Sequence, residues 1–528
     1  MQYKSLSEFL LSWIPKFAEK NKAACKAFWL LETTGSKDAA DLKSHLDLEI
    51  KMMLSDAKTY EQLLLWEDQN GAKDPLEKRQ LEMLIRLFKE NQIPTQLLRK
   101  ITEKETEIAL EYAAFRPTLN GKKMSENDLR DILKNEKDVA IRKKAWEASK
   151  VIGSKLAPKI IELVKYRNEA AQKLGYENYF LLQLDLQEVQ EKPLFNLLKE
   201  LSSKSKSSYD KLVEQIEAKL AEKFGVEASQ IGPWAYSDPF GQEDPLEASQ
   251  LDALVQDVDM AKAAKDFFEE MGFCNVGEIL ENSDLYEREG KNQHAFCMNV
   301  DHDKDIRTLN NLRPSIRWME TLLHELGHGV YEQGYAESLP WLLRQPPHMI
   351  PTEAMALLCG RQAYMNEFLS KQGVSSDAIA TAEESLKRRE LIFSRWVLVM
   401  TYFERDLYQN PDQDLNSLWW KYVEAFQKIK AKNREGSFDW ASKYHIGLAP
   451  VYYFSYLLGE LYASSLQKAL KKEQNTLLSS ETKNFLEKKV FAKGAALSWE
   501  QLIESSLGKK LTAEDWLEEF GSEVEALS

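Results

Sequence analysis

Metal-binding and disulfide-forming side chains are scarce in this sequence. Its 528 residues include 4 cysteines and 7 histidines. The four cysteines are far apart and form no C-x-x-C pair, which excludes the disulfide framework of a small secreted domain. We therefore expect reduced thiols and a cytoplasmic protein.

Long apolar runs are also missing. The longest, residues 27–31 and 396–400, fall far short of the roughly 20 residues that a membrane-spanning helix needs. The N-terminal stretch MQYKSLSEFLLSWIPKFAEKNK interrupts its apolar positions with charged residues, whereas a signal peptide has an unbroken apolar core of about 7–15 residues. These absences predict a soluble protein that is neither membrane-spanning nor exported.

Positive charge is in the minority. Lysine and arginine together number 70, against 84 aspartates and glutamates, which gives a formal net charge of −14. An acidic balance favours solubility and argues against nucleic acid or an anionic membrane as a partner. With 43% hydrophobic residues, the chain is able to bury a large core in one big domain or two interleaved ones.

Helical periodicity, in contrast, is abundant. From residue 1 to about 115, apolar residues recur at three- and four-residue spacing, which predicts an N-terminal cover of successive helices. Turn signals at 34–36 and 70–71 separate these helices, and residues 41–67 are predicted as one of them. The pattern continues through 120–230, with a joint or kink at Pro158, and through 370–430. We therefore predict a mainly helical, all-α fold.

Two stretches interrupt the helical pattern. The patch IGPWAYSDPFGQEDP at 231–245 is rich in glycine and proline, and it is a candidate boundary between two halves. Its aromatic residues make it equally a candidate substrate-facing loop. Residues 293–300 and 305–309 flank a polar turn and predict a small antiparallel β-hairpin. An unpaired strand edge can bind an extended peptide as an additional strand.

One motif carries the chemistry. His324, Glu325 and His328 form an H-E-x-x-H directly after the predicted hairpin. On a helix, residues four apart lie on one face, so the two imidazoles are able to occupy adjacent corners of a zinc tetrahedron, with Glu325 beside them as a base. Apolar residues at helical spacing predict the core-facing side of the same helix: Met319, Leu322, Leu323, Leu326 and Val330.

A catalytic zinc ion usually has three protein ligands and a water molecule, so a third ligand must follow the motif. The candidates are Glu353 and His348. We favour Glu353, because it opens a new helix after Pro351-Thr352 and gives a rigid His₂Glu site. We expect one Zn²⁺ ion per chain, with Glu325 taking a proton from the attacking water. A tyrosine or histidine of the segment 442–466 would donate to the oxyanion, although such residues also suit ordinary packing.

Three segments together resemble a known family. HELGH, LPWLLR at 339–344 and PTEAMA at 351–356 resemble the angiotensin-converting-enzyme-like peptidyl-dipeptidases and, more broadly, thimet oligopeptidase and oligoendopeptidase F. The similarity runs from about residue 160 to the C-terminus. It implies a gluzincin metallopeptidase in which residues 1–528 form a single catalytic domain of two interleaved helical lobes. It also implies a two-lobed ellipsoid whose deep central channel admits only short, unstructured peptides.

The resemblance assigns roles to individual residues. It places the metal ligands at His324, His328 and Glu353, with Glu325 as the base. It implies a second substrate-contacting histidine of the catalytic machinery at His445 and an oxyanion donor at Tyr456. The residues that it implies in substrate binding are His294, Ala295 on the edge strand and, for a C-terminal carboxylate, Lys443 and Tyr453.

Four positions depart from the dipeptidase pattern. The glutamine that completes its carboxylate site falls at Tyr236, and one extra residue before Tyr453 makes Tyr452 an alternative to it. An arginine that holds chloride is replaced by Ser455, so chloride activation is not expected. The aspartate one turn after the third ligand is Leu357, which leaves the partners of the zinc histidines unidentified.

The sequence also supports a second resemblance and a non-enzymatic interpretation. HELGHGVYEQG is similar to the signature of the thermostable zinc carboxypeptidases, although these usually continue with H-E-S-Q where this chain has P-T-E-A. A catalytically silent, helical peptide-binding protein is the alternative of another class. The prediction is zinc-dependent hydrolysis of peptide bonds in short, unstructured peptides, by a peptidyl-dipeptidase or an oligopeptidase. The sequence leaves the oligomeric state open.

Overall fold

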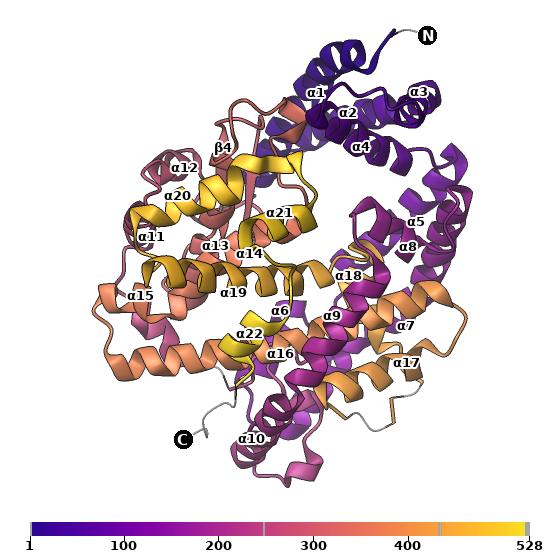
Figure 1. Ribbon diagram of the computed structural model, residues 1–528. Coiled ribbons are helices and arrows are strands. Elements are labelled where there is room, and N and C mark those ends of the chain that lie inside the picture. The colour runs from indigo at the N-terminus through magenta and orange to yellow at the C-terminus, as the bar shows by residue number, and fades with distance from the viewer. Residues whose placement is uncertain (1–2, 247–248, 431–432, 435, 523–528) are drawn as a thin grey trace. The chain divides into compact units, whose positions relative to one another are not determined.

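The computed structural model describes residues 3–246, 249–430, 433–434 and 436–522, and these residues are mainly helical (Figure 1). The predicted helical fold is confirmed. The chain divides into two compact units, each built from three separate stretches. Unit 1 comprises Met1–Gln92, Ser249–Glu383 and Leu458–Asp515, and unit 2 comprises Ile93–Ala248, Glu384–Leu457 and Trp516–Ser528. The single catalytic domain and the central channel stay predictions.

Helices make up most of both units. Those of unit 1 are α1 (Leu6–Thr34), α2 (Lys37–Leu54), α3 (Ala57–Asp68), α4 (Pro75–Glu90), α11 (Met260–Glu270), α12 (Val276–Asn282), α13 (Ile316–Gln333), α14 (Met349–Gly360), α15 (Asn366–Leu369), α20 (Ser480–Lys489) and α21 (Trp499–Leu507). Those of unit 2 are α5 (Thr95–Ala114), α6 (Glu126–Asn135), α7 (Val139–Lys173), α8 (Tyr179–Leu186), α9 (Glu191–Lys204), α10 (Lys206–Phe224), α17 (Leu415–Tyr422) and α18 (Tyr444–Leu448). Residues of both units occur in α16 (Ser376–Gln409), α19 (Phe454–Gln474) and α22 (Glu514–Phe520). No helix within the described ranges is both long enough and apolar enough to cross a membrane.

Capping residues decide where the N-terminal helices begin and end. α1 stops at Thr34, where Gly35 adopts a left-handed φ of 63°, and Ser36 then caps α2. Residues 41–67 form two helices instead of the predicted one. The reason is the Asp56 carboxylate, which accepts a hydrogen bond from the Thr59 N–H (2.7 Å) and thereby starts α3. α1 and α2 lie side by side in unit 1 (Figure 1), whereas α5 begins unit 2.

Helix α7 supports the glycine- and proline-rich patch at 231–245. It runs as one helix of 35 residues through Pro158, and not as two joined helices. Near its start Trp146 donates to the carbonyl of Pro239, and Arg142 donates to the carbonyls of Trp234, Ala235 and Tyr236. The patch is therefore an ordered loop of unit 2, and the boundary between the units follows it, between residues 248 and 249.

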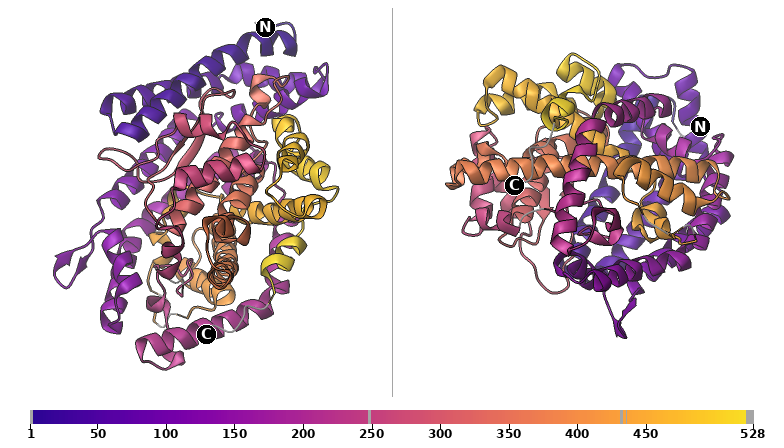
Figure 2. Two further views of the ribbon diagram at one scale, coloured as in Figure 1. Left: turned by 90° about the vertical axis from the view of Figure 1, so that its left-hand side faces the viewer. Right: turned by 90° about the horizontal axis from the view of Figure 1, so that it is seen from below.

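Two small antiparallel sheets accompany the helices. The predicted hairpin is present but shorter, with β3 (Phe296–Asn299) paired to β4 (Ile306–Leu309). The far side of β4 is bridged by Asp284, so β3 is the outer strand, and within the described residues it pairs with β4 alone. The second sheet, β1 (Thr118–Leu119) with β2 (Lys122–Lys123), was not predicted and projects from the helices of unit 2 (Figure 2).

Candidate active site

The H-E-x-x-H motif lies on α13, and its helix begins at a well-defined cap. The Ser315 hydroxyl accepts the Trp318 N–H (3.2 Å), and Asp252 accepts the Ile316 N–H (3.0 Å). The predicted core side of the helix is completely buried, at 0% exposure for Met319, Leu322, Leu323, Leu326 and Val330. The motif's two imidazoles stand close together, with ring centroids 4.9 Å apart.

Helix α14 packs against α13 in the opposite direction. His328 contacts Thr352 at the start of α14, and His324 faces Gly360 at its end. Gly327 makes this approach possible, because a Cβ atom there would lie 2.8 Å from the Cα of Ala356. The glycine of HELGH therefore brings α14, and with it Glu353, onto the two histidines.

The three predicted metal ligands come together within unit 1. One donor atom from each of His324, His328 and Glu353 lies within 4.8 Å of the others. The Nε2 atom of His324 is 3.6 Å from one Glu353 carboxylate oxygen, and that of His328 is 3.9 Å from the other. A tetrahedral ion with bonds of about 2.0–2.2 Å separates its ligand atoms by roughly 3.3–3.6 Å. The arrangement is thus close to that of a His₂Glu zinc site.

Burial shifts every titratable group of this site toward its neutral form. It raises the pKa of Glu353 to about 7 and lowers that of His324 to about 4 and that of His328 well below its usual value. Burial and the nearby Glu353 raise the pKa of Glu325 to about 8. A divalent cation would reverse the carboxyl shifts, because it stabilises ionised carboxylates.

The Oε2 atom of Glu353 provides an independent test of whether a metal ion fits. Glu353 is 5% exposed, and its Oε2 is buried without a hydrogen-bond partner. Buried polar atoms nearly always have a partner, so this oxygen is one that a cation would satisfy. Two imidazoles and a carboxylate are also the donor set that suits zinc.

Thr352, which the sequence did not identify as functional, holds one of the histidines. Its Oγ1 lies 2.7 Å from the Nδ1 atom of His328, and its side chain is 4% exposed. This contact leaves Nε2 of His328 directed at the metal site. His348, the competing third ligand, instead caps α14 by accepting the Ile350 N–H at Nδ1 (3.0 Å). Glu353 alone of the two candidates belongs to the metal-binding group.

Strand β3 lies beside α13, the helix that carries the H-E-x-x-H motif, as predicted for the hairpin. Glu325 and Glu332 of α13 lie near Cys297 of β3. The pKa of the Cys297 thiol is raised mainly by burial and, to a smaller extent, by these two carboxyl groups. The Asn299 side chain donates to Glu332 (3.1 Å). His294 and Ala295, the predicted substrate-binding residues, immediately precede β3, with His294 exposed and its N–H bonded to Asn292 (2.8 Å).

Unit 2 gathers the residues predicted to bind a C-terminal carboxylate. The Lys443 ammonium lies 5.6 Å from the Tyr453 ring centroid and donates to the Gln242 side-chain oxygen (3.0 Å). The glutamine that contacts Lys443 is therefore Gln242, six residues after the expected position Tyr236. Tyr236 is buried, and among the described residues no hydrogen bond joins it to Lys443. Gln242 is the only glutamine of the patch 231–245, and this is the sequence feature that could have identified it.

His445 and two tyrosines stand in the same part of unit 2. The rings of His445 and Tyr453 are 4.9 Å apart, and those of Tyr453 and Tyr456 are 5.6 Å apart. Tyr453 also lies beside Lys443. Burial lowers the pKa of His445 to about 4, and its Nδ1 atom is buried without a partner, so it remains able to bond a ligand.

A strained turn leads into these tyrosines. Val451 has a φ of 55°, a conformation that a β-branched residue rarely adopts. Its N–H donates to the Glu404 carboxyl (3.0 Å), and its carbonyl accepts from Gln187 (3.1 Å). These bonds hold the turn that leads into Tyr453.

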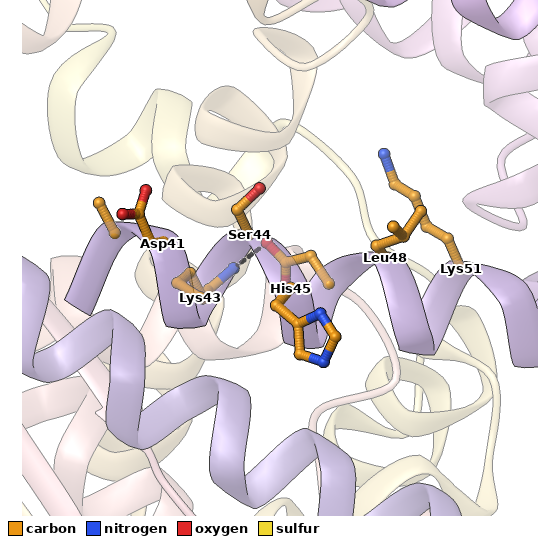
Figure 3. Close-up of a pocket in the computed structure, with 8 residues that line it drawn as sticks. Asp41, Lys43, Ser44, His45, Leu48 and Lys51 are labelled. Atoms are coloured by element: carbon orange, nitrogen blue, oxygen red, sulfur yellow. Dashed lines mark hydrogen bonds and ion pairs between the residues drawn. The ribbon is translucent and has the colours of Figure 1, made fainter. Parts of the chain in front are cut away.

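An open hollow along α2 holds none of these residues. It is lined by residues of α2 alone, among them Asp41, Lys43 and His45 (Figure 3). His45 lies 3.5 Å from Glu49 one turn later, and Lys43 pairs with Asp47. Such i,i+4 pairs are typical of a solvated helix face, so this hollow is not a catalytic pocket.

Comparison with known families agrees with this geometry. The profile described as Peptidase family M3 matches residues 132–522, about three quarters of the chain, and includes the whole metal-binding group. The profile described as Angiotensin-converting enzyme matches residues 2–233. The similarity predicted from about residue 160 onward thus lies within the M3 match, and the angiotensin-converting-enzyme match covers the N-terminal part. No individual curated protein matches the chain.

The two profiles and the site support one conclusion. Both families are metallopeptidase families of the gluzincin type, and this chain has the two histidines and the glutamate that such enzymes use. The alternative of a peptide-binding protein without catalytic function is therefore set aside. Because the family match covers about three quarters of the sequence and contains all three ligands, the chain belongs to peptidase family M3 and is a metallopeptidase related to angiotensin-converting enzyme and thimet oligopeptidase.

Proposed function

We propose that this enzyme is a zinc-dependent peptidyl-dipeptidase that acts on short, unstructured peptides. The observation that supports this specificity is the contact between Lys443 and Gln242 beside Tyr453. A lysine ammonium, a side-chain amide and a phenol are all able to donate hydrogen bonds to a carboxylate. Lys443 is only 8% exposed, so a free C-terminal carboxylate reaching it would replace water with a counter-ion.

His324, His328 and Glu353 would hold a zinc ion, which when bound polarises the scissile carbonyl and lowers the pKa of a water molecule. Glu325 accepts the proton of the attacking water at its carboxylate and delivers it to the leaving amine. Its buried position, at 7% exposure, limits exchange of that proton with bulk water. Thr352 keeps His328 oriented through its Nδ1 atom.

The donors for the oxyanion are proposed from the predicted segment 442–466. Tyr456 and His445 present a phenol and an imidazole within one cluster around Tyr453. Hydrogen bonds of this kind act most strongly on charge that develops in the transition state. Tyr456 is therefore assigned to oxyanion stabilisation, and His445 and His294 to contacts with the substrate.

The outer strand β3 supports the preference for unstructured peptides. Only an extended segment can pair its backbone with a strand edge, so a folded protein must first unfold locally to bind. Ala295 and β3 provide such an edge next to Glu325. This mode recognises the backbone and places few demands on side chains.

Mass spectrometry of reaction products tests the proposal. Three peptides of one sequence would be compared: one with a free C-terminus, one C-terminally amidated and one N-terminally acetylated. The proposal expects dipeptides from the free and acetylated forms and slow cleavage of the amidated form. Internal cuts in the amidated peptide would identify an oligopeptidase, and release of single residues a carboxypeptidase. The Glu325→Gln variant is the control for a contaminating protease.

We also propose that the enzyme acts in the cytoplasm. The support is that all four cysteines are free thiols. Cell fractionation with an antibody to the protein tests this, and recovery with secreted proteins would contradict it.

A further inference from the structure

A second polar hollow lies within unit 2, and none of the residues assigned above lines it. It is enclosed by α9, α10, α16 and the turn Val423–Gln427, and has a volume of about 220 Å³. Four of its lining side chains are cationic, and only one is acidic. The cations are Lys199, Lys206, Arg395 and Lys428, and the acid is Asp210. Two serines, three aromatic rings and Ala425 complete the lining.

Arg395 is the buried cation of this pocket. It is 2% exposed, and its Nη1 donates to the carbonyl and hydroxyl oxygens of Ser202 (3.1 Å each). Its Nη2 donates to the Ser205 hydroxyl (2.6 Å), and its guanidinium stacks 4.7 Å from the centre of the Tyr209 ring. The remaining Nε–H is buried without a hydrogen-bond partner in the described chain. The hydrogen-bond partners of this cation are therefore all neutral, and Asp210 acts on it only through its charge.

Two other buried arginines of the same unit have an acidic partner. Arg388 pairs with Asp244 (2.9 Å), and Arg167 pairs with Glu105 (2.7 Å). Arg142 instead donates to four main-chain carbonyls. Buried charges normally have a counter-ion, because leaving water is costly for an unpaired ion. Burial accordingly lowers the pKa of Arg395 to about 10.

The single acid of the pocket does not neutralise it. Asp210 pairs with Lys206 and lies 3.9 Å from Lys428, so its one charge is divided between two lysines. Lys199 adds a further, exposed positive charge to the lining. Four cations thus line a pocket that has a single carboxylate.

We propose that this pocket is a binding site for a phosphate-class oxyanion, either inorganic phosphate or the phosphate group of a small molecule. The Nε–H of Arg395 supplies a charge-assisted hydrogen bond, and the lysines supply compact positive charges, which together suit a dianion. The serine hydroxyls add neutral donors. The volume exceeds that of one oxyanion and leaves room for a small organic group against the aromatic rings.

The pocket shares a wall with the loop that carries Gln242. The Tyr209 hydroxyl donates to the Gln427 carbonyl (3.1 Å). The Gln427 side chain in turn donates to the carbonyls of Phe240 (3.0 Å) and Gly241 (2.8 Å), directly before Gln242. An occupant of the pocket would therefore bind next to the network that positions Gln242.

Isothermal titration calorimetry of the full-length, zinc-loaded enzyme with inorganic phosphate tests the proposal. The measurement is independent of peptide hydrolysis, so its failure would not bear on the proposed function. We expect saturable binding of one phosphate per chain, with weaker binding of the monoanion chloride at matched ionic strength. Titration with a phosphorylated sugar distinguishes an organic phosphate, which would bind more tightly, from phosphate alone.

Variants of the lining decide whether binding occurs in this pocket. Arg395→Gln should weaken phosphate binding at least tenfold, because it removes a charged donor. The double variant Lys199→Gln with Lys428→Gln changes only partly or fully exposed side chains, so it should fold normally and still weaken binding several-fold. Lys192→Gln, an exposed position on the same helix α9 outside the pocket, is the matched control and should bind like the wild type.

The proposal is overturned if the wild type shows no saturable binding of millimolar phosphate. It is equally overturned if the double variant and Lys192→Gln bind as the wild type does, because the interaction would then be elsewhere on the surface. Loss of binding in the double variant with retention in Lys192→Gln supports it, whatever the folding of Arg395→Gln.

Discussion

Replacement of Thr352 by valine probes how this enzyme holds its metal ion. Thr352 and valine have nearly the same shape, and both are β-branched, so α14 and its packing should be unchanged. The substitution removes only the hydroxyl that lies 2.7 Å from Nδ1 of His328. Because Nε2 of the same ring faces Glu353, Nδ1 must carry the proton when Nε2 binds a metal ion, and the hydroxyl is its acceptor.

Two independent considerations give the magnitude. At this buried position, with Thr352 4% exposed, a donor left unsatisfied costs about 1–3 kcal/mol. Loss of a partner to a metal-binding histidine typically weakens metal binding by about 10- to 100-fold, which corresponds to roughly 1.4–2.7 kcal/mol. We therefore expect Thr352→Val to raise the zinc dissociation constant by about one to two orders of magnitude.

The assay is a zinc competition titration against a chelator of known affinity. Thr352→Ser is the matched control, since it keeps the hydroxyl and loses only a methyl group. The serine variant should stay close to the wild type, whereas the valine variant should release zinc at lower chelator concentration. Turnover at saturating zinc should recover largely in both variants. Wild-type zinc affinity in Thr352→Val, or an equal loss in both variants, would refute the assigned role.

Four further outcomes follow from the same structure. Glu325→Gln should retain zinc yet lower hydrolysis by about 10²- to 10⁴-fold, and a rate close to the wild type at full zinc content would exclude Glu325 as the base. Gly327→Ala should destabilise the protein by about 1–3 kcal/mol and weaken zinc binding, because the new Cβ would meet Ala356. Thermal denaturation measures the loss of stability, and Gly436→Ala is the control, because no atom lies within 4 Å of a Cβ there. Burial, opposed by the carboxylate of Asp238, lowers the pKa of Lys443 to about 8, so its charge is present below pH 8 and is lost above it. KM for peptides with a free C-terminus should accordingly rise as the pH passes through 8, and KM for amidated peptides should not. Tyr456→Phe should lower kcat more than it raises KM, and a change in KM alone would contradict a role confined to the transition state.

Much of the fold was predictable because it is local. Apolar residues at helical spacing predicted the helices, and Gly35 and Ser36 marked a boundary that the structure confirms. The errors were also local. The apolar spacing predicts one helix over residues 41–67 because it continues across Asp56. The Asp56 side chain instead ends that helix by capping the next one. The two-residue strands β1 and β2 have too few residues to produce a detectable alternation.

The candidate site also has a part that local sequence predicts and a part that it does not. The spacing of His324 and His328 is set by the helix that carries them, so their shared face was evident without a structure. Lys443 and Gln242 are 201 residues apart in the chain, and only folding brings them to 3.0 Å. The expected partner Tyr236 was six residues too early, because the loop 231–245 is shaped by hydrogen bonds from Arg142 and Trp146 that no local pattern reveals.

The sequence by itself determined the helical class, the metal-binding motif and the base, because each depends on spacing within one helix or on a few adjacent residues. Only the tertiary structure decided between Glu353 and His348, named Thr352 as the partner of His328, and revealed the unpartnered Nε–H of Arg395. These depend on which side chains meet across helices that are distant in the chain. The burial of a side chain, the direction in which it points and the close approach of two helices, as at Gly327, are set by packing. Packing is established only when the helices come together.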